Sequence, residues 1–302
     1  MINTKEGLIK VHVSTLLLGF SGVFVELIPL SAPLLALGRV LISCAFLYIF
    51  IHFKKESLRL SNLQHYAFVF AGGLLLGFHW TFFNLSVQTS SVAIGTLTFA
   101  SFPFFTIILE PYIYKERFLK RNIIVLALIL LGVYLIVPTF SLSDNTTLGV
   151  VYGVFASFCY SILYLINRRL SSDYDSYLIT FYEQFSALVF LTLYIYYIRG
   201  YELAVGGPIQ FLQLIFYGLV CTALAQTLSI SGQKHIRAQT ASIIQTLRSV
   251  YAIVFAMLFL AEIPTENEIM GAVCIVVAVL FASVMENYDG FEKIKRRFRK
   301  DD

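Results

Sequence analysis

The chain has 302 residues, 58% of them hydrophobic and 13% charged, with a formal net charge of +4 and a mean hydropathy of +0.78. Because soluble domains carry roughly 25% charged residues, this composition excludes a soluble globular protein and indicates a polytopic membrane protein. The positive charge lies in short connectors and one tail, and we expect no nucleic-acid partner.

Apolar runs long enough to cross a bilayer recur along the whole chain. A helix needs about 20 apolar residues to cross the ~30 Å hydrocarbon core, whereas barrel strands have only about 10 residues and alternate in polarity. The predicted fold class is therefore an all-α integral membrane protein with ten transmembrane helices. Their expected ranges are 9–28, 33–53, 66–86, 92–114, 122–138, 148–167, 177–198, 209–230, 239–261 and 268–286.

The basic residues predict the orientation of these helices. If the N-terminus is inside, the inner connectors and the tail hold nineteen of the 22 Lys and Arg residues, and the outer connectors hold only Arg199. By the positive-inside rule, both termini are expected in the cytoplasm. The basic tail at 289–302 is then an anchor at the inner leaflet.

The first two helices each carry an ionisable residue within about two turns of the outer face. These are Glu26 and Arg39, on either side of the short connector "LIPLSAP". We expect them to form a structural ion pair or an outer gate, and the sequence leaves both open.

Helix three contains "GFHWTFFNLS", which places His79, Trp80 and Asn84 just outside the midplane. His79 could carry a proton in coupling, or it could be a hydrogen-bonding core residue. Trp80 could stack on a flat or cationic substrate group, or it could only pack against its neighbours.

Helix nine contains "SIIQTLRSVY", which puts Arg248 in the middle of an almost uncharged run. At 1.5 Å per residue, Arg248 lies roughly 14 Å from the inner end of its helix, and Glu183 of helix seven lies roughly 9 Å from the same side. Ionisable groups at such depth are functional candidates. We expect the two to share the cavity as binding charge and counter-charge, or to form a buried ion pair that fixes helix packing. The candidate substrate-binding residues are Arg248, Glu183, Trp80, His79, Gln245, Tyr160, Tyr164, Asn84, Gln184 and Gln226.

An internal repeat relates the two halves of the chain. Helices four and five, with Lys115-Glu116 between them, match helices nine and ten, with Ala261-Glu262 between them, at an offset of 146 residues. Five helices per half make the two copies opposite in orientation, as in transporters built from inverted repeats. The expected domains are a first repeat at 1–139, a second repeat at 147–288 and the basic tail.

Several sequence features together resemble the drug/metabolite transporter superfamily, EamA type. They are the ten-helix count, "LGRVLIS", "SVAIGTLTFASFPFF", the two helix-end glutamates and "GVYLIV". This resemblance implies a secondary transporter for small metabolites, often amino acids, or for drugs, whose helices one to four and six to nine enclose the cavity. The second half differs from the family pattern because it has Arg248-Ser249 where a proline is frequent, opposite Phe102-Pro103 of the first half.

We therefore expect a secondary-active transporter, exporter or uptake carrier, that moves a small polar metabolite by alternating access. An amino acid or related carboxylate-bearing compound is favoured, because a midplane arginine suits an anionic group. The alternatives are a multidrug or hydrophobic-cation exporter of the same fold and, in a different class, a membrane-embedded lipid-modifying enzyme.

No catalytic residue, metal site or cofactor is expected. The five histidines are scattered, the four cysteines show no CxxC spacing, and no GxxxxGK[ST] phosphate loop occurs. The expected location is a bacterial inner membrane, with a small-molecule substrate and membrane lipids as partners. The substrate, the direction of transport, the coupling ion and the oligomeric state, including a homodimer, stay open.

Overall fold

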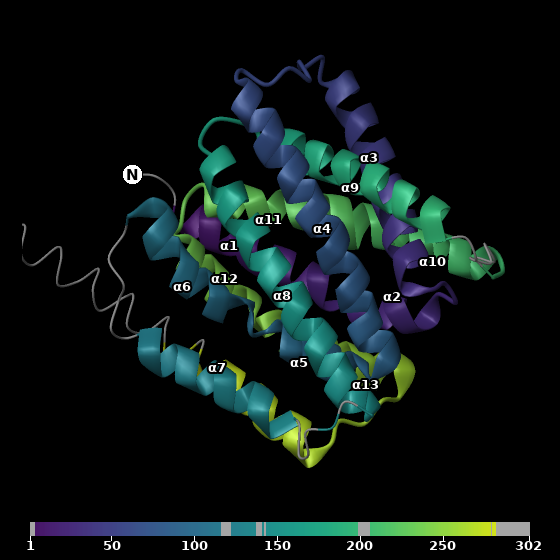
Figure 1. Ribbon diagram of the computed structural model, residues 1–302, viewed down its shortest axis with the longest axis vertical. Coiled ribbons are helices and arrows are strands. Elements are labelled where there is room, and N and C mark those ends of the chain that lie inside the picture. The colour runs from purple at the N-terminus through teal and green to yellow at the C-terminus, as the bar shows by residue number, and fades with distance from the viewer. Residues whose placement is uncertain are drawn as a thin grey trace, which may run out of the picture.

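A computed structural model describes residues 4–115, 122–136, 141, 143–198, 206–278, 280 and 281. The regular elements within them are helices, and eight spans are long and apolar enough to cross a membrane (Figure 1). The spans are α1 (Thr4–Gly19) with α2 (Ser21–Leu27), α3 (Ala32–Phe53), α4 (Leu63–Thr89), α5 (Val92–Phe99) with α6 (Phe102–Tyr114), α8 (Asn145–Leu170), α9 (Ser176–Ile198), α10 (Pro208–Gly218) with the π-helix η1 (Leu219–Leu224) and α11 (Ala225–Gln233), and α12 (Ala238–Gln245) with α13 (Leu247–Leu260).

Two further helices coincide with the fifth and tenth expected ranges. They are the shorter apolar helix α7 (Asn122–Ile136) and a helix over residues 266–278. The all-α membrane fold is thus confirmed in the described residues, whereas ten crossings, two inverted repeats and cytoplasmic termini stay predictions. Glu116 and the basic tail at 289–302 lie outside the described residues.

Short polar side chains start several of these helices. Asn62 accepts a hydrogen bond from the backbone N–H of Gln64 before α4, and Ser91 accepts one from Ile94 at the start of α5. Asp144 does the same at the start of α8, where it accepts from Thr147. Such caps satisfy N–H groups that the first turn of a helix leaves without partners. They explain how one span ends and the next begins within a few residues.

Two of the spans are broken in the middle and match each other at the 146-residue offset. Val92–Tyr114 breaks after Phe99, and Ala238–Leu260 breaks after Gln245. Both spans end on a residue with left-handed backbone, Lys115 with φ 52° and Ala261 with φ 54°. Because the ends, the break and the final turn all coincide, the two spans share one backbone design.

The two breaks have different chemical causes. Pro103 lies in the first turn of α6, where its missing N–H costs nothing. In the other half, Ser249 takes the place of this proline, and its hydroxyl donates to the carbonyl of Thr246 at 2.8 Å. Thr246 in turn donates to the carbonyl of Ile243 at 2.6 Å. Such hydroxyl bonds compete with regular helical hydrogen bonding, so a helix can break here without a proline.

The helices pack around one central region. Helix α4 crosses α8 and α9, while α1 packs on α11, α12 and α13. Gly73 lets α4 approach α9 so closely that a methyl group there would lie 2.5 Å from the carbonyl oxygen of Glu183. Helix α7 lies at the edge of the molecule beside the helix over 266–278 (Figure 1), with Gly132 against Gly271. The central region is therefore enclosed by the spans other than these two.

Candidate substrate site

The guanidinium group of Arg248 is buried among aromatic rings. Its Cζ lies 4.5 Å from the ring centre of Phe83, 4.6 Å from that of Phe99 and 5.9 Å from that of Trp80. The residue is 1% exposed, and none of its three side-chain nitrogens has a hydrogen-bond partner among the described residues. A buried guanidinium without hydrogen bonds is costly, and the rings compensate only part of the lost hydration. The described groups around Arg248 therefore leave its donors unused.

Arg39 of α3 lies on the same tryptophan but is held by the protein. Its Cζ lies 3.4 Å from the ring centre of Trp80. Its Nε donates to the hydroxyl of Thr222 at 2.9 Å, one terminal nitrogen donates to the hydroxyl of Tyr217, and the other to the carbonyl of Cys221 at 3.2 Å. All three nitrogens thus have partners, most of them on η1.

The π-helix η1 explains how these partners reach Arg39. A π-helical turn shifts the backbone register by one residue, and such turns frequently occur at functional sites. Thr222 uses the wider turn to donate to the carbonyl of Tyr217, five residues earlier, at 2.8 Å. The expected ion pair between Arg39 and Glu26 is not formed, since Arg39 bonds to η1 and Glu26 is exposed at the end of α2.

His79 packs against the aromatic residues of this centre. Its Nδ1 lies 3.0 Å from the carbonyl oxygen of Ala156, and its ring centre lies 4.7 Å from that of Trp80 and 4.6 Å from that of Tyr160. A proton on this ring would add a third positive charge beside the two arginines. The geometry therefore favours an orienting role for His79 over proton transfer.

A chain of polar groups leads from the aromatic centre towards α11. The hydroxyl of Tyr160 donates to the side chain of Gln245 at 3.4 Å, and Gln245 donates to the hydroxyl of Ser229 at 2.6 Å. Tyr164 packs beside Tyr160, and its hydroxyl has no hydrogen-bond partner in the described part of the chain. These residues bring α8, α11 and α12 together on the α11 side of the aromatic centre.

Glu183 belongs to a separate polar group farther along this route. It lies on α9 against Gly72 of α4, with the amides of Asn167 and Gln226 beside its carboxyl. Neither carboxyl oxygen has a hydrogen-bond partner within the described residues. The expected ion pair between Glu183 and Arg248 is therefore not formed in this structure, and Tyr160 is near enough to both groups to interact with each of them.

The remaining expected residues have other surroundings. Asn84 donates from its amide to the carbonyl of Ala32 at 3.1 Å and so holds the start of α3. Gln184 is buried on α9, next to Glu183 in sequence, and neither atom of its amide has a partner among the described residues. The sequence prediction thus combines two groups, one around Arg248 and one around Glu183.

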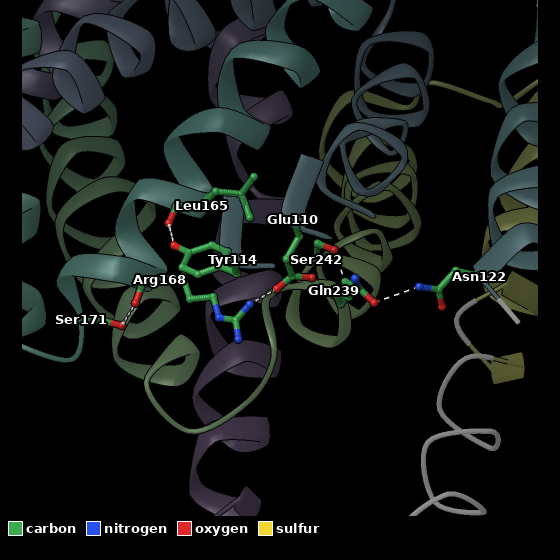
Figure 2. A network of polar contacts seen from close by, with 8 residues as sticks. All are labelled: Glu110, Tyr114, Asn122, Leu165, Arg168, Ser171, Gln239 and Ser242. Atoms are coloured by element: carbon green, nitrogen blue, oxygen red, sulfur yellow. Dashed lines mark hydrogen bonds and ion pairs between the residues drawn. The ribbon is translucent and has the colours of Figure 1, made fainter. Parts of the chain in front are cut away.

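A network of polar contacts closes one side of the molecule (Figure 2). Glu110 of α6 is fully buried and forms an ion pair with Arg168 of α8. The guanidinium of Arg168 also lies 4.6 Å from the ring centre of Tyr114. Nearby, Asn122 of α7 donates to the side chain of Gln239 at 2.8 Å. These contacts tie α6 and α7 to α8 and α12, on the side that the basic residues predict to be cytoplasmic.

Several residues of the centre were not expected from the sequence. Phe83, Phe99 and Tyr217 form cation–π contacts with one of the two arginines, and Arg39 itself belongs to the site. The 146-residue offset pairs Phe99 with Gln245 and Phe102 with Arg248. The repeat in the sequence therefore indicates Phe99 as a residue of this centre. The rings of Phe99 and Phe102 are stacked, with centres 5.1 Å apart.

Comparisons with known proteins identify the class of the molecule. The profile of the EamA-like transporter family matches twice, over residues 5–137 and 147–284. The chain belongs to the EamA-like transporter family. Among the described residues, no group of three or more His, Cys, Asp or Glu could hold a metal ion.

Relatives of this EamA-like chain carry general names. An uncharacterized transporter of Archaeoglobus fulgidus is 25% identical and covers 65% of this chain and 69% of its own length. The uncharacterized transporter YdfC of Bacillus subtilis is 24% identical over 84% of this chain and 82% of its own length. Human solute carrier family 35 member G1 is 28% identical over 67% of this chain, which spans 58% of that relative.

A solved crystal structure has the same fold. It superimposes with a TM-score of 0.72 at 12% identity and covers 93% of this chain and 97% of that one. The family and the relatives therefore establish a membrane transport protein, and the substrate must be inferred from the residues of the site.

Proposed function

We propose that this EamA-like transporter is a secondary-active carrier of a small organic anion, with an amino acid or related carboxylate-bearing metabolite as substrate. The carboxylate binds the guanidinium of Arg248, and the rings of Trp80 and Phe99 enclose the rest of the ligand. Transport proceeds by alternating access between the two halves of the molecule, in the inner membrane of a bacterium.

One observation supports this proposal above all others. The side chain of Arg248 is buried with three unused donor groups, while Arg39 on the same tryptophan has all its donors occupied. Two guanidinium groups on one ring, neither in an ion pair with a described carboxylate, create a strongly positive centre. A carboxylate supplies the missing charge and two acceptors in the planar arrangement that a guanidinium binds best.

The alternative functions are less consistent with this chemistry. A hydrophobic-cation exporter would need a negative or neutral aromatic centre, whereas both charges at Trp80 are positive. A lipid-modifying enzyme would need acid/base residues or a metal set near one interface. Among the described residues, the ionisable groups at this centre are instead two arginines, tyrosines, Cys221 and a single histidine.

The centre is closed to solvent in this structure. Trp80, Tyr160 and Arg248 are each at most 1% exposed. The ion pair of Glu110 and Arg168 holds the expected cytoplasmic side together. Opening of this side, or of the opposite one, is needed for a ligand to reach Arg248, which is consistent with alternating access.

A thermal-shift screen of the purified protein tests the proposal. The panel contains L-glutamate, L-aspartate, malate, a sugar phosphate, neutral amino acids and cationic dyes. A ligand at 100 times its Kd raises the free energy of unfolding by about 2.7 kcal/mol. We expect carboxylates to stabilise wild-type protein and Arg169→Gln, whose arginine is exposed at the end of α8, but not Arg248→Gln. Stabilisation by the dyes alone, or carboxylate shifts that persist in Arg248→Gln, would contradict it.

A further inference from the structure

The buried carboxyl group of Glu183 has no assigned role once it is separated from Arg248. It is fully buried on α9, and α4 presents only Gly72 and its neighbours to it. Asn167 of α8 and Gln226 of α11 lie beside it, and Leu163 of α8 lies against Gly72. None of these side chains carries a charge. A bare carboxylate in such surroundings is very unfavourable, so this group requires a neutralising partner.

Among the residues that the structure describes, the ionisable groups near Glu183 offer no such partner. Helix α8 contributes Tyr160, which is close enough to act on Glu183 electrostatically. Helix α3 contributes Cys44, which belongs to a hydrophobic cluster of residues that includes several from α9. No ionisable residue occurs in α11. On the next turn of α8, Arg168 is paired with Glu110.

The unused atoms around the carboxyl suit a protonated acid. The Asn167 amide has both its oxygen and its nitrogen without partners in the described structure, and Gln226 has a free oxygen. A carboxylic acid has one donor and one good acceptor, so it can donate to one amide oxygen and accept from an amide N–H. A single proton would thus neutralise the carboxylate and let the acid form hydrogen bonds with the neighbouring amides.

A polar pocket lies at the ends of the helices that carry Glu183, Asn167 and Gln226. It has a volume of about 230 Å³ and is lined by residues that include Ser171, Asp175, Ser176, Ser231 and Lys234. These residues come from the end of α8, the start of α9 and the end of α11, and Lys10 of α1 completes the lining. Ser176 and Glu183 are seven residues apart on α9, which is roughly 10 Å along the helix.

A pair of threonine hydroxyl groups joins α9 to α11 in the stretch between Ser176 and Glu183. Thr180, one turn before Glu183, accepts a hydrogen bond from Thr227 of α11 at 3.3 Å. Thr227 follows Gln226 directly, so this contact links the two helices beside the carboxyl. The hydroxyl of Thr180 itself donates to the carbonyl of Ser176 at 2.8 Å. A proton relay between pocket water and the acid through this pair therefore requires the Thr180 hydroxyl to rotate away from that carbonyl.

We propose that Glu183 is a proton-binding site of this carrier, filled from the pocket between α8, α9 and α11. The carboxylate accepts one proton from pocket water through the threonine hydroxyls and returns it when the site opens. Use of this proton to drive transport rests on the proposed function, whereas the proton site itself does not.

Infrared difference spectroscopy of the full chain in lipid nanodiscs tests the site without any substrate. A buried protonated carboxyl gives a carbonyl stretch apart from the amide bands, which shifts in heavy water. We expect this band in wild-type protein and in Glu266→Gln, whose carboxylate is exposed, and its complete loss in Glu183→Gln. If Glu183→Gln does not fold, Glu183→Asp replaces it and is expected to move the band.

Each contrary result overturns the proposal. A band that remains in Glu183→Gln belongs to another acid. A wild-type carboxyl that stays ionised at every pH at which the protein is folded, or whose carboxylate bands respond to sodium at constant pH, binds a metal cation instead. The route is tested by the rate of deuterium exchange of the band, which we expect to fall several-fold in Thr180→Val. An unchanged rate would exclude the pocket as the entrance.

Discussion

Replacement of the two buried arginines by methionine should change stability in opposite directions. Arg248→Met removes a cation whose three nitrogens have no partner among the described residues, whereas Arg39→Met removes one that bonds to Thr222, Tyr217 and Cys221. Both side chains are at most 1% exposed, and both lie on Trp80. The pair is therefore a matched comparison in which the protein partners of the guanidinium are the main difference.

The expected magnitudes follow from these contacts. At Arg248, the desolvation of a charge with unpaired donors is offset only by cation–π contacts of roughly 0.5–2 kcal/mol each. Its replacement by a well-packed apolar side chain should stabilise the ligand-free protein by about 1–4 kcal/mol. At Arg39, loss of the guanidinium leaves the hydroxyls of Thr222 and Tyr217 and the carbonyl of Cys221 without this donor and should destabilise it by about 1–3 kcal/mol.

Thermal unfolding of the ligand-free proteins in one detergent measures both changes. We expect a raised melting temperature for Arg248→Met and a lowered one for Arg39→Met. Equal destabilisation by the two variants would refute the reasoning, because Arg248 would then be a structural residue like Arg39. A raised melting temperature without loss of ligand binding in Arg248→Met would also refute it.

Three further predictions concern the walls and the packing of the site. Trp80→Phe should weaken carboxylate binding by roughly 2- to 10-fold, because it reduces an aromatic contact of about 0.5–1.5 kcal/mol with the enclosed part of the ligand; unchanged affinity in a titration would show that the tryptophan only packs. Gly73→Ala should destabilise the protein by about 1–3 kcal/mol, since the methyl group meets Ser186 and the backbone of Glu183. Gly207→Ala is its control, because that methyl group meets only the side chain of Gln210, and equal melting temperatures for the two would contradict the close approach of α4 and α9. Ser242 of α12 is fully buried beside the Glu110–Arg168 ion pair (Figure 2). Glu110→Gln breaks this ion pair and should speed the modification of Ser242→Cys by a water-soluble thiol reagent by about 10-fold or more, as a charged hydrogen bond contributes about 1.5–3 kcal/mol. The native cysteines are replaced by alanine in that background, and an unchanged rate would exclude this contact as a gate.

The amino-acid sequence predicts much of the fold because helix length and basic connectors are local properties. The ends of Val92–Tyr114 and Ala238–Leu260 follow from hydrophobicity and from the repeat. The depth of Arg248 in its helix also follows, since depth depends only on residue number and rise. His79, Trp80, Tyr160 and Gln245 gather near Arg248 as expected.

The partners of the charged residues could not be predicted in the same way. Partner choice depends on the rotation of each helix about its axis, which depth does not determine. Arg39 therefore faces η1 and not Glu26, and a π-helical turn of this kind has no simple sequence signal. Glu183 lies only about 5 Å from Arg248 in depth. It nevertheless faces Gly72 of α4, because two adjacent glycines let α4 and α9 come together there.

A ligand-bound structure of the protein with the carboxylate that gives the largest thermal shift tests the central claim most directly. The account predicts that the carboxylate of the ligand accepts hydrogen bonds from the guanidinium of Arg248, within about 2.7–3.2 Å, with the rest of the ligand between Trp80 and Phe99. A ligand bound elsewhere, with the guanidinium of Arg248 still without partners, would contradict it.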